Sequence, residues 1–425
     1  MGMTMTEKIL AAHCGASLVR PGQYIWASVD GTALISGSSG LAAIRRLEKL
    51  GVARLFDSDK VYVVDDHLAP APTVEAANAM TEIRRFVKKY GVTHFFDWGR
   101  HGILHELFPN HGYVSPGDLI ASVDSHSTSY GCFNVASCSL NEELVLVLAL
   151  GKLWLRVPES IKCVLHGRLA GAEGFVVGKD VALYLAGKYG TDAALYKSIE
   201  FVGPAVHQMS MASRFSIANM AAELGAKFGI FPCDDKTLEY LDGKMRRPPL
   251  PTALDSDAAY AKVYEVDVTD LPPYVARPHD PGRSVPVTDV EGDHLRITQA
   301  FLGTCTNGRM EDFRMAASVL KGRSVHRDVR LIVTPASQAI WSQCLKEGIW
   351  NVFSDAGALI TGSTCGACSG LHMGVLADKD ICISSGPRNF LGRMGSEQAE
   401  VYLANPATVV ASAVAGEIVD PRRFL

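Results

Sequence analysis

The stretch Thr361-Gly-Ser-Thr-Cys-Gly-Ala-Cys-Ser-Gly370 carries Cys365 and Cys368 in a Cys-x-x-Cys pattern. A third cysteine, Cys305, lies about sixty residues earlier in Gly303-Thr-Cys-Thr-Asn-Gly308. Small residues flank each cysteine and let the backbone approach a bulky inorganic group closely. Three thiolates are one fewer than a cubane iron–sulfur cluster normally takes, so one iron lacks a protein ligand. Because an open coordination position is typical of catalytic metal sites, we predict a catalytic [4Fe–4S] cluster that acts as a Lewis acid.

Two other uses of these cysteines are open at this point. A structural zinc site of Cys3His type could recruit His372, which lies four residues after Cys368. A thioredoxin-like redox pair is disfavoured because no matching βαβ context surrounds the pattern. Other cysteines are expected to be ordinary buried small hydrophobic residues; they include Cys14, Cys163, Cys233, Cys344 and Cys382.

Composition is that of a globular protein, with 425 residues, 48% hydrophobic residues and 20% charged residues. The net charge of −4 gives no electrostatic basis for binding nucleic acid or a membrane surface. We see no apolar run of about 18 residues and no signal-peptide core near the N-terminus, so no membrane association is expected. Ten scattered cysteines favour reduced thiols and a cytoplasmic or organelle-matrix location.

Alternating strand and helix patterns predict an α/β fold class. Residues 40–51 have the periodicity of an amphipathic helix, and residues 60–65 are typical of a buried strand. Thr73 is expected to cap a helix that runs to Tyr90, where Gly91 ends it. Further on, we predict a helix over residues 216–228. A proline-rich stretch over residues 246–286 has the composition of a linker.

Histidines follow three predicted strands, each near a carboxylate. Asp66 and His67 follow the strand at 60–65, His105 follows the strand at 93–96, and Asp124 and His126 are expected to alternate at the end of a third strand. Side chains at strand ends of open α/β sheets are where sites are built. A single histidine is more often a satisfied core residue, but three beside a metal site indicate proton transfer to and from oxygen.

Arg388 and Arg393 lie five residues apart in a glycine-containing loop after a predicted strand. Two guanidinium groups so placed can clamp a carboxylate, because each binds it through two parallel hydrogen bonds. Seen alone, the pair could also be two surface arginines, which is the less favoured alternative.

These motifs together resemble the aconitase superfamily, specifically the stand-alone large subunits of the 3-isopropylmalate dehydratase and homoaconitase type. The resemblance runs from Lys8 to Arg423. The matching stretches are Asp66-His67, Gly102-Ile-Leu-His105, Asp124-Ser-His126, Asn219-Met-Ala-Ala-Glu-Leu-Gly-Ala226, Cys305-Thr-Asn-Gly308, Cys365-Gly-Ala-Cys368, Arg388-Asn-Phe-Leu-Gly-Arg393 and Asn405-Pro-Ala-Thr-Val-Val-Ala-Ser412.

The resemblance implies three α/β/α domains around a central iron–sulfur cleft, expected at residues 1–160, 161–285 and 286–425, the second ending in the proline-rich linker. It implies a hydro-lyase of a hydroxy di- or tricarboxylic acid. The implied roles fall into three sets: cluster ligation by Cys305, Cys365 and Cys368; acid–base catalysis by Asp66–His67, by a His105–Glu200 pair and by an Asp124–His126 pair; and substrate binding by Arg388, Arg393 and Ser125.

The resemblance also implies a partner. Full-length aconitases carry a fourth, swivelling domain that supplies the base for the substrate Cα proton. This chain ends at Leu425 with the third-domain motif, so we expect a separate small subunit to supply that domain, and little activity from the isolated chain.

Three stretches depart from the family pattern. Ile35-Ser-Gly-Ser-Ser39 replaces a His-Asp-x-Thr stretch, Ala136-Ser-Cys-Ser-Leu-Asn-Glu142 lacks the usual glycines, and Pro387 replaces a common Asn. The leading prediction is a 3-isopropylmalate dehydratase of leucine biosynthesis. The departures keep open a homoaconitase, a substituted-malate dehydratase such as one for dimethylmalate, and a degenerate non-catalytic relative. An iron-sensing or RNA-binding use is disfavoured by the charge.

Overall fold

The computed structural model describes residues 2–425. The chain forms two compact units, each made of segments that are discontinuous in sequence. Unit 1 comprises residues 1–165, 194–207 and 225–266, and unit 2 comprises residues 166–193, 208–224 and 267–425. Within the described residues, no helix combines the length and apolar character needed to cross a membrane.

Unit 1 contains a five-stranded sheet in the order β4-β3-β2-β5-β6, in which all neighbouring strands are parallel. The strands are β2 (Gly31–Ile35), β3 (Val61–Val64), β4 (His94–Phe96), β5 (Leu119–Ser122) and β6 (Ala136–Ser139). Strands β2, β3 and β5 are buried along their whole length, as their continuous apolar runs predict. Because the strands are parallel, the segments that follow them leave from one edge of the sheet.

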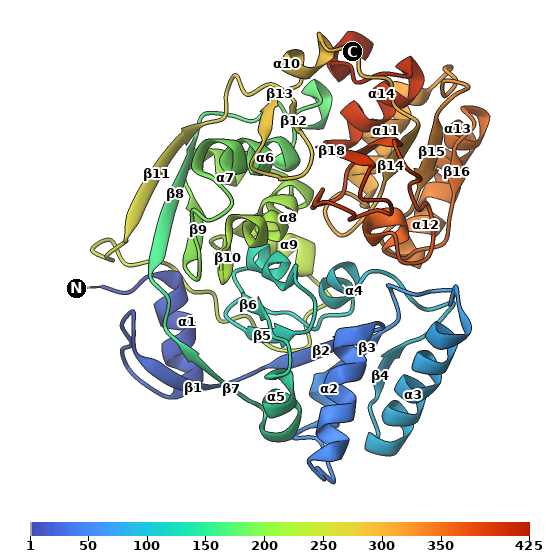
Figure 1. Ribbon diagram of the computed structural model, residues 1–425. Coiled ribbons are helices and arrows are strands. Elements are labelled where there is room, and N and C mark those ends of the chain that lie inside the picture. The colour runs from blue at the N-terminus through green and yellow to red at the C-terminus, as the bar shows by residue number, and fades with distance from the viewer. Residues whose placement is uncertain (1) are drawn as a thin grey trace. The chain divides into compact units, whose positions relative to one another are not determined.

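Helices α2 (Ser38–Lys49), α3 (Val74–Tyr90), α4 (Leu104–Asn110) and α5 (Leu144–Leu150) belong to this part of unit 1. Helices α2 and α3 pack against each other beside the sheet (Figure 1). The hydroxyl of Thr73 accepts a hydrogen bond from the backbone N–H of Ala76, and Gly91 ends α3 in the left-handed conformation. The predicted boundaries of α3 are therefore confirmed at both ends.

The rest of unit 1 is built on a four-stranded sheet in the order β10-β9-β8-β11. Its strands are β8 (Ser160–His166), β9 (Ser198–Val202), β10 (Phe228–Ile230) and β11 (Lys262–Asp267). An antiparallel ribbon joins β1 (Tyr24–Ser28) to β7 (Lys152–Arg156). Helices α1 (Met5–Cys14) and α9 (Asp235–Leu241) complete this unit, and the short α7 (Pro204–Gln208) lies at its boundary.

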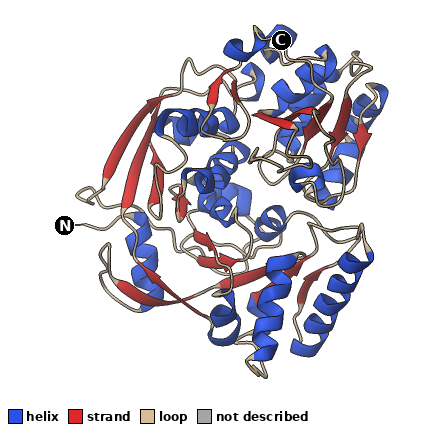
Figure 2. Cartoon of the chain, in the orientation of Figure 1, coloured by secondary structure: helices blue, strands red, loops and turns tan. Residues whose placement is uncertain are grey.

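Unit 2 is built on a seven-stranded sheet in the order β13-β12-β18-β17-β14-β15-β16. Figure 2 distinguishes the strands from the helices by colour. Its strands are β12 (Tyr274–Ala276), β13 (Ser284–Pro286), β14 (Gln299–Leu302), β15 (Arg330–Val333), β16 (Leu359–Ile360), β17 (Ile381–Ser384) and β18 (Glu400–Ala404). The five strands from β18 to β16 are parallel, and β12 is antiparallel to both of its neighbours.

The helices of unit 2 are α6 (Gly178–Tyr189), α8 (Met211–Met220), α10 (Thr288–Glu291), α11 (Met310–Leu320), α12 (Gln338–Lys346), α13 (Ile349–Asp355) and α14 (Pro406–Ala415). Helix α11 packs against α14, and α14 packs against β14. The helix predicted over 216–228 is wrong at both ends: α8 begins at Met211, after its Ser210 cap, and residues 228–230 form β10. Ser210 accepts from the N–H of Ser213 and fixes that start.

The proline-rich stretch at 246–286 is not the bare linker that its composition suggests, because it contains β11, β12 and β13. Prolines are tolerated here since β13, which ends in Pro286, is an edge strand. The α/β fold class predicted from the sequence is confirmed by this alternation of parallel strands and helices. The expected three-domain boundaries remain a prediction.

Candidate active site

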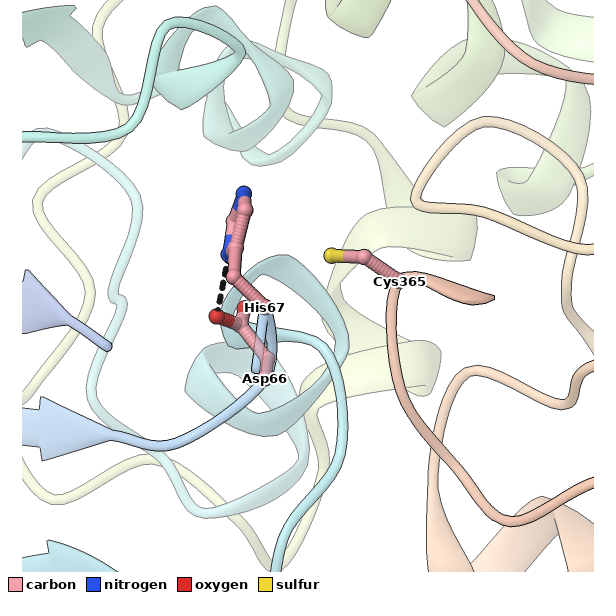
Figure 3. A group of neighbouring side chains, drawn as sticks. All are labelled: Asp66, His67 and Cys365. Carbon is pink, nitrogen blue, oxygen red and sulfur yellow. Dashed lines mark hydrogen bonds and ion pairs between the residues drawn. The ribbon is translucent and has the colours of Figure 1, made fainter. Parts of the chain in front are cut away.

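Asp66 and His67 lie directly after β3 in unit 1. The Asp66 carboxylate accepts a hydrogen bond from His67 Nδ1 at 2.6 Å, as Figure 3 shows, and another from the backbone N–H of Leu104 at 3.0 Å. The hydroxyl of Ser36, which follows β2, accepts from the backbone N–H groups of Asp66 and His67 at 3.1 and 3.2 Å. Ser36, in the stretch that departs from the family pattern, therefore holds the backbone of Asp66 and His67 in place. Figure 3 also labels Cys365, which belongs to unit 2.

Asp124 is the carboxylate that brings the three predicted histidines together. Its Oδ1 lies 2.6 Å from His105 Nε2, its Oδ2 lies 3.8 Å from His67 Nε2, and Oδ1 lies 3.9 Å from His126 Nδ1. The backbone N–H of His126 also donates to Oδ1 at 2.8 Å. Burial would raise the pKa of Asp124, but the adjacent histidines, His105 foremost, hold this pKa well below its usual range. Asp124 is therefore ionised at neutral pH.

Two details of the predicted pairing are corrected. His105, at the start of α4, pairs with Asp124 and places Nδ1 3.2 Å from the hydroxyl of Tyr130. Glu200 in β9 accepts from Thr6 and from the hydroxyl of Tyr260 at 2.7 Å, so among the described residues the expected His105–Glu200 pair does not form. Burial raises the pKa of Glu200.

Asp124 and His126 do not alternate along a strand, because β5 ends at Ser122 and both residues lie in the following turn. The turn forms since the Ser122 hydroxyl accepts from the backbone N–H of Asp124 at 3.1 Å. Ser125 Oγ lies 3.3 Å from His126 Nδ1. Asp124 and His126 do lie together, but in a turn and not along a strand as predicted.

In unit 2, Cys305 lies between β14 and α11, and Cys365 and Cys368 lie in the segment after β16. All three are buried, 7 to 9% exposed, and none of them forms a disulfide within the described residues. The side-chain amide of Asn219, in α8, donates to the Cys305 sulfur at 3.2 Å. The Arg393 guanidinium lies 3.6 Å from the Cys368 sulfur. Donors aimed at sulfur are what a thiolate ligand or a cluster needs around it.

Two further observations fit a bulky group at these cysteines. A Cβ built on Gly386 would lie 4.0 Å from the Cys368 sulfur, so the backbone of this glycine lies beside that sulfur. The hydroxyl of Ser363, two residues before Cys365, is fully buried and has no hydrogen-bond partner among the described residues. His372, the residue that a Cys3His zinc site would use, has Nε2 3.4 Å from Thr364 Oγ1.

The loop after β17 carries the two predicted arginines. Arg388 Nε donates to the Glu223 carboxylate at 2.8 Å, and Arg393 Nε donates to the carbonyl of Cys368 at 3.0 Å. Burial would lower the pKa of Arg393, but the Cys368 and Cys365 sulfurs and the Glu223 carboxylate together raise this pKa. Both arginines are therefore held by this unit itself, which excludes the reading of two free surface arginines.

The structure adds three residues that the sequence reasoning did not select. Asn219 and Glu223 lie in a stretch quoted for the resemblance, so a signal existed, but it named no role for them. Lys179 in α6 is fully buried and donates to the carbonyls of Ser385 and Gly386. No sequence pattern indicated Lys179.

Known proteins were compared with this chain. The model of the aconitase family (aconitate hydratase) matches residues 56–416. The 3-isopropylmalate dehydratase large subunit of Aquifex aeolicus is 45% identical to this chain, over 99% of this chain and 97% of that protein. The protein of the same name from Desulfitobacterium hafniense is also 45% identical, over the full length of both chains. Another from Methanopyrus kandleri, named large subunit 1, is also 45% identical over the full length of both. The crystal structure of Thermococcus kodakaraensis aconitase X in its holo form shares the fold, with a TM-score of 0.51 at 13% identity over 97% of this chain and all of that one.

Proposed function

This chain belongs to the aconitase family, and from that premise we propose that it is the cluster-bearing large subunit of a hydro-lyase. The substrate class is a hydroxy di- or tricarboxylic acid that is dehydrated or isomerised through an alkene, as in a 3-isopropylmalate dehydratase. The observation that carries this proposal is the set of three buried cysteines outside any disulfide, with an amide directed at the sulfur of Cys305 and a guanidinium at the sulfur of Cys368.

The residues that would hold a [4Fe–4S] cluster are Cys305, Cys365 and Cys368. When bound, such a cluster supplies a Lewis acid that polarises the hydroxyl that leaves the substrate. Asn219 and Arg393 lower the cost of negative charge on the sulfurs they contact, because hydrogen bonds to ligating sulfur stabilise its charged form.

Acid–base work is assigned to unit 1. Asp66 fixes the His67 ring through Nδ1, which leaves Nε2 as the nitrogen that moves a proton. Asp124 stays ionised and orients His105 in the same way through Nε2. The backbone N–H of His126 donates a hydrogen bond to the Asp124 carboxylate, which positions this histidine.

Substrate contacts are assigned to Arg388, Arg393 and Ser125. The arginines would bind carboxylate, and Glu223 keeps the Arg388 fork in one orientation. Glu200, whose raised pKa comes from burial, is kept as a catalytic candidate although its contacts to Thr6 and Tyr260 also suit a structural role.

A small subunit that carries the swivelling domain is the proposed partner, because the relatives are named large subunits and this chain covers 97 to 100% of the first of them. The proposed location is the cytoplasm or an organelle matrix. Homocitrate and dimethylmalate remain alternative substrates, since Ser36 lies in the stretch that departs from the family and supports His67.

Anaerobic purification tests this proposal. We expect a brown, oxygen-labile protein with about four irons per chain, the content of a cubane cluster. Each of Cys305→Ala, Cys365→Ala and Cys368→Ala should lose most of that iron. Cys382→Ala is the matched control, since Cys382 is a buried free thiol in β17 of the same unit. Colourless wild type with one zinc would refute the cluster.

Activity is then measured with the chain and its small subunit together on 3-isopropylmalate, homocitrate and dimethylmalate. Turnover on one of these identifies the substrate. A chain that binds the cluster but turns over none of them, with its partner present, would be a degenerate relative.

A further inference from the structure

Lys179 is a lysine in a position that ordinary protein energetics disfavours. Its side chain is fully buried, and lysines are almost never so buried unless they are paired. It is the second residue of α6, where the helix dipole disfavours positive charge. Among the described residues, no carboxylate lies within ion-pair distance of its ammonium group. Burial and the dipole of α6 both disfavour a positive charge on Lys179. A charged ammonium group at this position therefore needs a compensating negative group.

The hydrogen bonds of Lys179 show where its charge is placed. The ammonium group donates to the carbonyls of Ser385 and Gly386, in the loop after β17. Gly386 is the residue whose Cβ would lie 4.0 Å from the Cys368 sulfur. The Ser385 hydroxyl bridges to the backbone N–H and carbonyl of Gly303 at 2.9 and 3.1 Å, two residues before Cys305. Lys179 therefore holds a loop that contacts both cysteine-bearing segments, at Gly303 and at Cys368.

The sulfurs of two proposed cluster ligands lie close enough to Lys179 to act on its charge. Cys305 and Cys368 exert the largest favourable charge interactions on it, ahead of Asp180 and Glu223. Asp180 is occupied by the side-chain amide of Asn405, which contacts both of its oxygens. Glu223 is paired with Arg388. The carboxylates of this region are thus committed elsewhere, and sulfur is left as the partner of the ammonium.

We propose that Lys179 is a positioning residue that supplies a fixed positive charge to the cysteine-bound cluster and locks the Ser385–Gly386 loop beside it. This inference rests on the proposed function, because three thiolates around a cluster leave the site with net negative charge. One buried cation stabilises that charge and favours the more reduced state of the cluster. The same contacts keep the loop that carries Arg388 in place.

The test compares Lys179→Gln, which keeps a hydrogen-bond donor without the charge, with Lys179→Met, which keeps neither. Lys188→Met is the control: Lys188 lies in the same helix, is exposed, and contacts the hydroxyl of Tyr184. Three quantities are measured anaerobically: iron and sulfide per chain, the rate of iron loss to a chelator, and the midpoint potential from an EPR-monitored titration. Thermal unfolding of each cluster-free chain reports folding separately.

We expect both Lys179 variants to lose iron about tenfold faster than wild type, the scale on which groups around a ligand set affect metal affinity. Their midpoint potentials should move to more negative values, since a nearby positive charge is gone. If Lys179→Gln keeps its iron and its midpoint potential at the wild-type values, the inference about Lys179 is overturned while the proposed function stands. If wild type holds no cluster, the proposed function fails and this inference fails with it. If the Met variant does not fold, the Gln variant decides.

Discussion

One oxygen of Asp124 lies 2.6 Å from Nε2 of His105, and the other lies 3.8 Å from Nε2 of His67. A single ionised carboxylate thus faces two imidazoles that come from different loops of the same sheet. His67 is already fixed by Asp66 through its other nitrogen. The charge on Asp124 therefore interacts with both imidazoles at once.

Asp124→Asn should lower kcat by about 10²- to 10⁴-fold, the usual contribution of a positioned acid–base group. An amide keeps the shape but removes the charge that stabilises protonated histidine. Steady-state assay of the chain with its small subunit measures the effect, and iron content should be unchanged. Asp97→Asn is the control, because Asp97 is paired with Arg84 on α3. Equal losses in both variants, or a loss under threefold in Asp124→Asn, would contradict the assignment.

Asp65 gives a prediction about pH. It is fully buried, and burial raises its pKa to about 6. The unfolded value is about 3.9, so between these values the folded chain binds a proton that the unfolded chain releases. The free energy of unfolding therefore falls as pH rises through this window, by up to about 3 kcal/mol. Asp65→Asn removes this pH dependence. The stability of the variant relative to wild type should therefore increase from pH 4 to pH 7.

Denaturant unfolding at each pH measures that difference. Asp97→Asn provides the opposite sign, because the ion pair with Arg84 is the main factor that lowers the pKa of Asp97. Its stabilising effect is present above about pH 4 and is lost as pH falls further. The same pH trend in both variants would show that burial of Asp65 is not the cause.

Several helices, strands and site residues could be predicted from chemistry that acts over short stretches of the chain. Thr73 and Gly91 bound α3 because a hydroxyl cap and a left-handed glycine act within one helical turn. The continuous apolar run at residues 60–65 predicted the buried parallel strand β3. The three cysteines were selected because their spacing and small neighbours are visible along the chain.

What could not be predicted depends on contacts across long sequence separations. His105 pairs with Asp124 rather than Glu200, and nothing in either sequence neighbourhood distinguishes these two carboxylates. Asn219 reaches the sulfur of Cys305 over 86 positions. Arg309 is the N-cap residue of α11, and its backbone N–H donates to Asp312. The side-chain amide of Asn307 donates to the same carboxylate.

Thr73→Ala should destabilise the chain by about 1 kcal/mol, because the N–H of Ala76 loses its acceptor. Thr81→Ala is the matched control in the same helix. The Thr81 hydroxyl bonds back to the carbonyl of Ala77 and caps nothing, and alanine is the better helix former, so this change should be neutral or slightly stabilising. Denaturant unfolding measures both. A loss of similar size in the two variants would assign the effect to threonine packing instead.

Arg388→Lys keeps the positive charge but removes the planar fork that pairs with Glu223. If Arg388 binds a substrate carboxylate, kcat/KM should fall about 10- to 100-fold, the value of a charge-assisted hydrogen bond of about 1.5 to 3 kcal/mol. The loss should appear mainly as a higher KM for the hydroxy acid. Arg330→Lys is the control, since Arg330 forms an exposed ion pair with Asp380 in the same unit. A variant with unchanged KM but reduced iron content would instead make Arg388 a support for the cysteine loop, and substrate binding would fall to Arg393 alone.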